Sequence, residues 1–244
     1  MLSVKHLYKK YENAEIPSVD DLSFTFETGK IIGLLGPNGA GKTTTISILC
    51  GLIGDFKGEV HVLGMDIRSK NNAIKSKIGV VPQQIALYPT LSCSENLMYF
   101  GKLYDIQPQT LKNLIAQYLH DFGLEEHAHK QIKHFSGGMK RRTNIIASLL
   151  NNPTLLILDE PTAGVDVHSR NMILSFLKQY NTAGNSIMYT SHLLEEAEAI
   201  CHEVLIIDQG KKIAQGNPKT LVKNHAVGNL EELFLQLTGN TVRD

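Results

Sequence analysis

The segment GPNGAGKTT, Gly36 to Thr44, decides how this chain of 244 residues folds. It fits the pattern G-x-x-x-x-G-K-[ST] at every fixed position, follows the apolar run KIIGLLG and opens the apolar-periodic segment KTTTISILCGL. Glycines let such a strand-to-helix turn point successive backbone N–H groups, and the helix N-terminus, at an anion. The pattern predicts a buried strand, a phosphate-binding loop and a helix that ends near Gly54.

The same loop carries side chains suited to phosphate chemistry. Lys42 can reach the β- and γ-phosphates of a nucleotide, and the Thr43 hydroxyl can ligate Mg²⁺. The alternative is a glycine-rich turn that binds nothing, which the flanking strand and helix patterns disfavour. The residues predicted to bind the nucleotide here are Gly36, Pro37, Asn38, Gly39, Ala40, Gly41, Lys42, Thr43 and Thr44.

A second element of a phosphate site is LLILDEP, Leu155 to Pro161. Its apolar residues predict a buried strand, and Asp159 at the carboxyl end is placed to hold Mg²⁺ directly or through water. Glu160 can take a proton from an attacking water, a role that typically contributes about 10²–10⁴-fold in rate. The alternative, an exposed acidic pair, is disfavoured by the turn at Pro161. The two elements predict a P-loop nucleotide hydrolase or transferase; no N-K-x-D element for guanine is present, and a kinase stays open.

Strand and helix patterns alternate along most of the chain, which implies a mostly parallel sheet and an α/β fold. Residues 89–152 differ, because three segments there carry apolar residues at three- and four-residue spacing with no strand between them. We expect an inserted helical segment at this point. The remaining expected strands are LSFTF, EVHVLG, IGVVP, TLLILDE, SIMYTS and a hairpin that turns at Gly210, and the remaining expected helices are residues 167–180 and LLEEAEAICHE.

Composition narrows the possible partners. Lys plus Arg and Asp plus Glu number 24 each, so no global basic field favours nucleic acid, and we expect no such partner. Cys50, Cys93 and Cys201 show no CxxC spacing and predict reduced thiols. No apolar run approaches 18 residues and no signal-peptide pattern opens the chain, so no membrane span is expected. His127 and His129 are interpreted as part of a solvated loop.

The segment FSGGM, Phe135 to Met139, lies between the two phosphate-site elements and just before a predicted helix. This order resembles the nucleotide-binding subunits of ATP-binding-cassette (ABC) proteins, whose signature sequence is typically LSGGQ. The resemblance includes Tyr11, 25 residues before Gly36, where the family has an aromatic residue that stacks on adenine. It also includes the Q-loop, the D-loop and the switch histidine, at Gln83, Ala163–Asp166 and His192.

The resemblance implies that the nucleotide is ATP and gives each matched residue a role. Tyr11 would stack on adenine, Gln83 would sense Mg²⁺ and the attacking water, and His192 would contact the γ-phosphate. Each has an alternative: Tyr11 could be an ordinary strand aromatic, Gln84 could replace its neighbour, and His192 could be a capping or core residue. Asp166 of the D-loop could simply cap the next helix, and can do so as well.

The resemblance also implies that two subunits pack head to tail, with the signature of one covering the ATP held by the other. The second subunit would be another copy of this chain or a homologous ATPase subunit. Ser136 would supply a hydroxyl, and the backbones of Gly137 and Gly138 would approach the γ-phosphate without Cβ hindrance. The catalytic residues implied are Glu160, His192 and Gln83, and those implied for Mg²⁺ are Thr43, Gln83 and Asp159.

Two positions depart from the usual signature. Phe135 replaces leucine in an apolar slot, and Met139 replaces glutamine and cannot form the amide hydrogen bonds expected there. The form SGGMKRR and the tail NLEELFLQLTG resemble the ABC-2-type exporter branch. Lys140, Arg141 and Arg142 are expected to form a solvated helix face, with at most one aliphatic stem packing inward.

The implied fold is a P-loop NTPase (RecA-like) core with a mostly parallel sheet, an N-terminal antiparallel β subdomain and an inserted α-helical subdomain. We expect one domain over residues 1–244. Residues 1–88 and 153–220 would form the catalytic core with the β subdomain, residues 89–152 the helical signature subdomain, and residues 221–244 a C-terminal helical tail.

The implied function is ATP hydrolysis at the cytoplasmic face of the cell membrane, powering transport, and by resemblance export, through a separate integral membrane permease subunit. A partner helix could dock near QQIALYPTLSCSENL, against Ile85, Leu87 and Tyr88. The alternative is that these three residues belong to the core of the helical insert. Rival functions are a soluble ABC ATPase acting on a macromolecular assembly, and a non-hydrolysing regulatory subunit, which the full set of catalytic residues disfavours.

Overall fold

A four-stranded antiparallel sheet begins the chain in the computed structural model, which describes residues 1–239. Alternate residues of this sheet are buried, as the period-two apolar pattern of LSFTF predicts. Its strand order is β2-β1-β4-β5. The strands are β1 (Leu2–Lys9), β2 (Val19–Phe26), β4 (Lys57–Val62) and β5 (Met65–Asp66).

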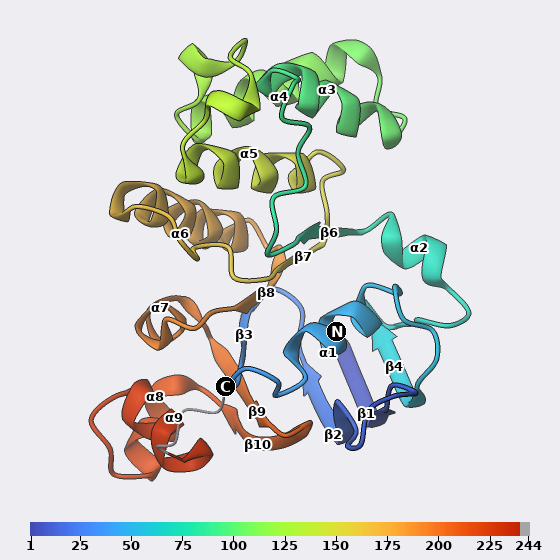
Figure 1. Cartoon of the computed structure of the whole chain (residues 1–244), viewed down its shortest axis with the longest axis vertical. Coiled ribbons are helices and arrows are strands. Elements are labelled where there is room, and N and C mark those ends of the chain that lie inside the picture. Colours follow the sequence, from blue (N-terminus) through green and yellow to red (C-terminus); the bar gives the residue numbers. More distant parts are fainter. Residues whose placement is uncertain (240–244) are drawn as a thin grey trace.

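A six-stranded sheet of order β10-β9-β3-β8-β7-β6 forms the centre of the molecule (Figure 1). Its strands pair in parallel except β10, which forms the predicted antiparallel hairpin with β9. Because the strands are parallel, their carboxyl ends meet at one edge, where the loops after β3, β7 and β8 come together. The strands are β3 (Ile31–Leu35), β6 (Ile78–Val81), β7 (Leu155–Leu158), β8 (Ser186–Thr190), β9 (Glu203–Asp208) and β10 (Lys211–Gly216).

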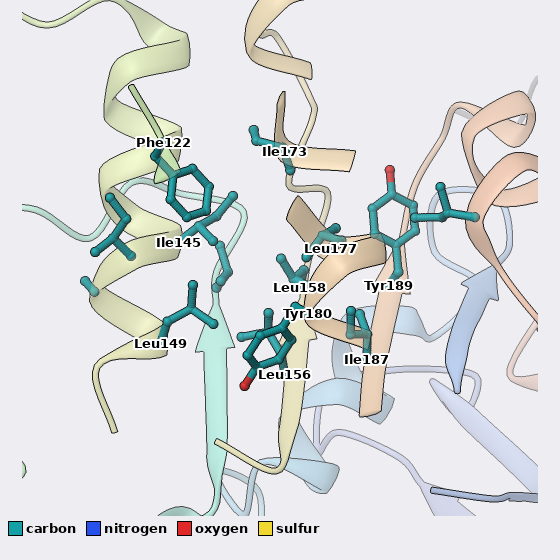
Figure 2. Close-up of a cluster of buried hydrophobic side chains, with 14 of the residues drawn as sticks. Phe122, Ile145, Leu149, Leu156, Leu158, Ile173, Leu177, Tyr180, Ile187 and Tyr189 are labelled. Atoms are coloured by element: carbon teal, nitrogen blue, oxygen red, sulfur yellow. The ribbon is translucent and has the colours of Figure 1, made fainter. Parts of the chain in front are cut away.

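The central sheet separates two hydrophobic cores. On β3, Ile31 and Leu35 face one core and Ile32 and Leu34 face the other, because successive side chains of a strand point to opposite sides. One core lies between the two sheets and contains the apolar face of α1 (Lys42–Leu49). The other joins the sheet to the remaining helices, and Figure 2 shows part of it.

Helices cover the second face of the central sheet. Those of the core and tail are α6 (Val167–Thr182), α7 (Leu194–Ile200), α8 (Pro218–Asn224) and α9 (Leu230–Thr238), and α2 (Asn71–Lys75) precedes β6. Beyond α6 lie α3 (Cys93–Leu103), α4 (Pro108–Asp121) and α5 (Gly137–Leu149), which form the upper part of Figure 1. Within the described residues, none of these helices is long and apolar enough to cross a membrane.

The helical content expected for residues 89–152 is confirmed. Two short 3₁₀ turns, Glu125–His127 and Ile132–His134, connect α4 to α5, and a single β-bridge joins Ser92 to Gln131. These helices share one core with α6 and β7. The division into subdomains remains a prediction.

Two local expectations differ from the structure. The first helix ends at Leu49 rather than near Gly54, because Gly51 adopts φ +66° and its N–H bonds back to the Ile48 carbonyl, a typical helix terminator. Strand β1 and helix α2 were not expected from the local pattern. Residues 240–244 of the expected tail lie outside the described residues.

Candidate ATP-binding and catalytic site

The loop from β3 to α1 needs glycine at two positions. A Cβ on Gly36 would lie 2.4 Å from the Ile207 carbonyl oxygen. Gly41 adopts φ +99°, and a Cβ there would lie 2.2 Å from the Ser18 carbonyl oxygen. Gly41 is also the N-cap of α1, and no side chain accepts a hydrogen bond at this end. The first N–H groups of α1 are therefore available to an anion.

Lys42 turns back over the loop. Its buried ammonium donates hydrogen bonds to the carbonyl oxygens of Gly36 at 2.6 Å and Pro37 at 3.0 Å. Desolvation lowers the pKa of Lys42, while the nearby charges of Glu160 and Asp159 act in the opposite direction. The cation is held against the backbone that would surround a phosphate chain, as a P-loop lysine requires.

The carboxylate pair after β7 is fixed by one hydroxyl of the neighbouring strand. Thr190 Oγ1 donates to Asp159 Oδ1 at 2.7 Å and accepts from the Glu160 backbone N–H at 2.9 Å. Glu160 has φ +49°, a left-handed conformation that costs a residue with a side chain about 1–3 kcal/mol. Such strain persists where surrounding contacts over-determine it, and here the backbone N–H and the side chain of Glu160 are both held by neighbouring segments.

The Glu160 side chain is held on both oxygens. Gln83 Nε2 donates to Oε2 at 2.8 Å, and His192 Nε2 contacts Oε1. Glu160 is nearly buried, whereas 45% of the His192 side chain is exposed. The three residues predicted to be catalytic, which come from segments far apart in the sequence, are thus brought into direct contact.

These residues and the phosphate loop line one cleft of about 360 Å³. A base, a cationic loop and a half-exposed histidine share this space, which suits hydrolysis of a phosphoanhydride by water. The predicted site residues that line the cleft are Asn38, Gly39, Ala40, Gly41, Lys42, Thr43, Thr44, Gln83, Glu160 and His192.

The donor set here fits Mg²⁺. This ion prefers oxygen ligands and keeps several waters or substrate phosphates, so it does not need a dedicated cage of carboxylates. Thr43 and Gln83 line the cleft, and Asp159 precedes Glu160 in the chain and is held by Thr190. Gln83 uses its amide nitrogen on Glu160, which leaves its oxygen to serve a metal. Among the described residues, no group of three or more His, Cys, Asp or Glu side chains is arranged so that it could hold a metal ion by itself.

Tyr11 lies at the edge of this site. Its hydroxyl is 3.5 Å from Thr44 Oγ1 and its side chain is largely exposed, with the Lys9 ammonium 5.1 Å from the ring centroid. An exposed ring beside the phosphate loop could stack on a base, and that role stays a prediction. Gln83, rather than Gln84, makes the contact with Glu160.

The signature residues lie elsewhere. Ser136 caps α5 by accepting from the Met139 N–H at 3.2 Å, and neither residue lines the cleft that holds the phosphate loop. Helix α5 is well separated from α1 in Figure 1. Gly138 packs against the D-loop, because a Cβ there would lie 2.1 Å from Ser169 Oγ and 2.8 Å from Asp166 Oδ2. The chain therefore does not bring its own signature to its own phosphate loop.

Asp166 does cap helix α6, one of the two roles considered for it. It accepts from the Ser169 N–H at 2.9 Å, and hydrogen bonds from Ser169 are the main cause that lowers the pKa of Asp166.

Met139 and Phe135 both contribute to the large core, Phe135 as a buried member and Met139 as a partly buried neighbour. The two departures from the usual signature are therefore apolar packing residues.

The expectation that residues 140–142 form a solvated face is wrong. Arg141 is only 5% exposed and donates to the carbonyl oxygens of Pro82 and Gln83. Arg142 donates to the Phe122 carbonyl oxygen at 2.6 Å. Backbone carbonyls that end a strand and a helix lack partners of their own, and the two guanidinium groups satisfy them.

The expected docking residues divide into two groups. Leu87 is buried in the large core, so its assignment to a docking surface is wrong and the alternative of core packing holds for it. Ile85 and Tyr88 are exposed. Tyr88 contacts Tyr99 of α3 edge to face, with ring centroids 5.0 Å apart.

Two residues that the sequence reasoning missed organise the site. Thr190 joins Asp159 to Glu160, as described above. Glu196 of α7 is buried, and its Oε2 accepts from Thr162 Oγ1 at 2.7 Å and from the Tyr189 hydroxyl. Burial and this bond to Glu196 raise the pKa of Tyr189. The hydroxyl two residues before the switch histidine in YTSH was the available signal for Thr190, whereas Glu196 stands in an ordinary amphipathic helix pattern and gave none.

Comparison with known proteins agrees with this geometry. Residues 19–163 match the family model described as ABC transporter. The linearmycin resistance ATP-binding protein LnrL of Bacillus subtilis (strain 168) is 48% identical over 221 residues, which are 91% of this chain and 70% of the relative. The Nod factor export ATP-binding protein I of Ralstonia nicotianae is 40% identical over 93% of this chain and 70% of that relative. A solved ATP-binding subunit of an ABC transporter superposes with a TM-score of 0.87 at 27% identity, covering 97% of this chain and 99% of that chain.

Proposed function

This chain belongs to the ABC transporter family of ATP-binding subunits, and we propose that it hydrolyses ATP between two head-to-tail subunits with Glu160 as the general base. The contact of Glu160 with both Gln83 and His192, in the cleft of the phosphate loop, carries this proposal. A carboxylate held on both oxygens is oriented before substrate arrives, which avoids reorganisation during the reaction.

The reaction is a transfer of the γ-phosphoryl group to water. The water oxygen bonds to the γ-phosphorus, the bond from that phosphorus to the bridging oxygen of ADP breaks, and Glu160 takes the water proton. Lys42 and the N–H groups at the start of α1 stabilise the negative charge on the phosphates. His192 holds the γ-phosphate end of the cleft. Thr43, Asp159 and Gln83 would hold Mg²⁺, which would supply positive charge to offset that of the phosphates.

A second subunit completes the site. The separation of Ser136 and Gly137 from the phosphate loop supports this, because a residue that cannot reach its own ATP can reach that of a partner. Both residues are exposed, at the start of α5. The partner is another copy of this chain or a homologous ATPase subunit.

A membrane permease is the proposed second partner, which places the chain at the cytoplasmic face of the membrane. The exposed Ile85, next to the Gln83 loop, and the exposed rings of Tyr88 and Tyr99 offer an apolar surface where a short helix can pack. Export is the proposed direction, because relatives that are 48% and 40% identical are named for linearmycin resistance and for Nod factor export. The ABC-2-type branch remains part of this proposal.

The substitution Glu160→Gln tests the proposal. Removing the base while keeping its size should slow ATP turnover at least about a hundredfold. It should also trap ATP in a stable dimer, visible as a doubled mass by size-exclusion chromatography with light scattering. The matched control is Glu195→Gln, which removes an exposed carboxylate nearby on α7. Turnover that is equal in the two variants would show that the base is wrongly assigned.

A further inference from the structure

Arg141 joins the helix that follows the signature to the loop that carries Gln83. Its Nη1 donates to the Pro82 carbonyl oxygen at 2.8 Å and its Nη2 to the Gln83 carbonyl oxygen at 2.6 Å. Two parallel bonds from one planar guanidinium fix both distance and direction. The backbone of Gln83 is therefore held by α5, while its side chain is held by Glu160.

Two more residues of the same helix face reinforce this link. Ser148 Oγ donates to the Val80 carbonyl oxygen at 2.6 Å, and Asn144 Oδ1 accepts from the Ala86 N–H at 3.2 Å. Together with Arg141 they stand three and seven positions apart, on one side of a helix of 3.6 residues per turn. The segment 80–86 is thus tied to α5 at both ends and in the middle.

Arg141 is buried although its side chain is charged. No carboxylate forms a direct ion pair with it in the part of the chain that the structure describes. Desolvation lowers the pKa of Arg141, while the charges of Glu160 and Asp159 act in the opposite direction. Apolar packing at the place of a buried charge is often as stable, so burial of this guanidinium adds little stability and its two directed hydrogen bonds are the feature that apolar packing would lack. Lys140 and Arg142 do not reach the Gln83 loop.

We propose that Arg141 is a positioning residue that couples the signature loop to Gln83, so that engagement of the signature by the partner's ATP sets the geometry of Glu160 in its own site. The coupling runs from Ser136, the N-cap of α5, through one rigid helix to Arg141, then through Gln83 to Glu160. This rests on the proposed head-to-tail function, in which the signature contacts ATP across the dimer.

A double-mutant cycle on the full chain tests this, with steady-state ATPase as the readout. Arg141→Met should lower kcat about ten- to hundredfold, because a displaced Gln83 misaligns the base. The KM for ATP should stay within about threefold, because Arg141 does not touch the phosphate loop. In a Gln83→Ala background the same change should cost less than about twofold, since the group through which it acts is gone.

Arg142→Met is the matched control. It removes an adjacent guanidinium that also binds a backbone carbonyl, that of Phe122, but does not contact Gln83. Its effect on kcat, whatever its size, should be the same factor in both backgrounds. A structural role of Arg141 would give this additive behaviour too, together with a change in the KM for ATP.

Additive effects of Arg141→Met and Gln83→Ala would overturn the inference while leaving the proposed function intact. If Arg141→Met does not fold, Arg141→Lys carries the cycle, because its single ammonium cannot bind two carbonyls as a fork does. Arg141→Lys should lower kcat several-fold when Gln83 is present. In the Gln83→Ala background it should leave kcat unchanged. A wild-type chain without ATPase activity, or a Gln83→Ala variant at the wild-type rate, would remove both proposals.

Discussion

Helices α1 and α5 both begin in glycine-containing loops, yet their N-termini are built differently. At α1 the N-cap is Gly41, and no side chain accepts its first N–H groups. At α5 the N-cap is Ser136, whose hydroxyl already accepts from Met139. The difference shows that the free N–H groups of α1 can bind a phosphate. In α5 the serine cap already accepts a hydrogen bond from one of these N–H groups, and the helix presents a hydroxyl and an exposed glycine to a neighbour.

The two helices also differ in what their side chains pack against. Helix α1 is packed between the two sheets through Ile46 and Leu49, so the phosphate loop is joined to a buried core helix. Helix α5 packs on α3, α4 and α6 on one side, and on another side its polar residues tie it to the loop of Gln83. A helix so connected can carry a change at its N-terminus to a distant catalytic residue.

The largest effect that probes this comparison is expected for Gly41→Ala. The left-handed φ and the approach of the Ser18 carbonyl oxygen act together, so we expect the free energy of unfolding to fall by at least about 2 kcal/mol and ATP binding to be lost. Thermal unfolding and equilibrium binding of a fluorescent ATP analogue measure both. A stable Gly41→Ala protein that binds ATP would mean that α1 does not depend on its glycine N-cap.

A smaller effect is expected for Gly138→Ala, at the start of α5. The new Cβ would meet Ser169 Oγ at 2.1 Å, so the junction of α5 with α6 must shift, at a cost of about 1–3 kcal/mol in the free energy of unfolding. Gly137→Ala is the control, because its Cβ would only touch the Gly164 carbonyl oxygen at 3.6 Å. Urea unfolding compares the two variants, and equal stability would contradict the packing role given to Gly138.

The smallest effect concerns the cap of α6. Folding lowers the pKa of Asp166, the N-cap of this helix. Ionised Asp166 therefore stabilises the protein above the ordinary carboxyl pKa of about 3.9, and this contribution is lost as pH falls through the pKa of the folded state. Asp166→Asn keeps a capping side chain that does not titrate. The melting temperature of the wild type should therefore fall relative to this variant below about pH 4. A constant difference from pH 7 to pH 3 would contradict this assignment.

The phosphate-loop end of the molecule was largely predictable. Each of its features depends on residues close in sequence: glycines at Gly36 and Gly41, a lysine one step into the helix, and a buried strand before them. The same holds for Asp166, whose capping geometry involves residues three positions apart. Local rules of backbone geometry and hydrogen bonding decide such features, so a sequence pattern is enough.

The α5 end was predicted less well. The run of three cations after the signature looked like a solvated face, because helical spacing does not reveal which loop from another part of the chain covers it. Arg141 is buried by residues 58 and 59 positions away. Leu87 likewise reads as an exposed loop residue until the surrounding helices enclose it.

The sequence by itself determined the chemistry of this protein: the phosphate loop, the carboxylate pair, the alternating strands and helices, and the family resemblance carried by ordered motifs. Tertiary structure alone decided which groups meet, including the contacts of Glu160 with Gln83 and His192 and the hold of Arg141 on the Gln83 loop. The physical reason is the distance along the sequence over which each interaction acts. Backbone conformation follows from neighbours a few residues apart, whereas burial and the partner of a charge depend on the packing of segments that the sequence separates.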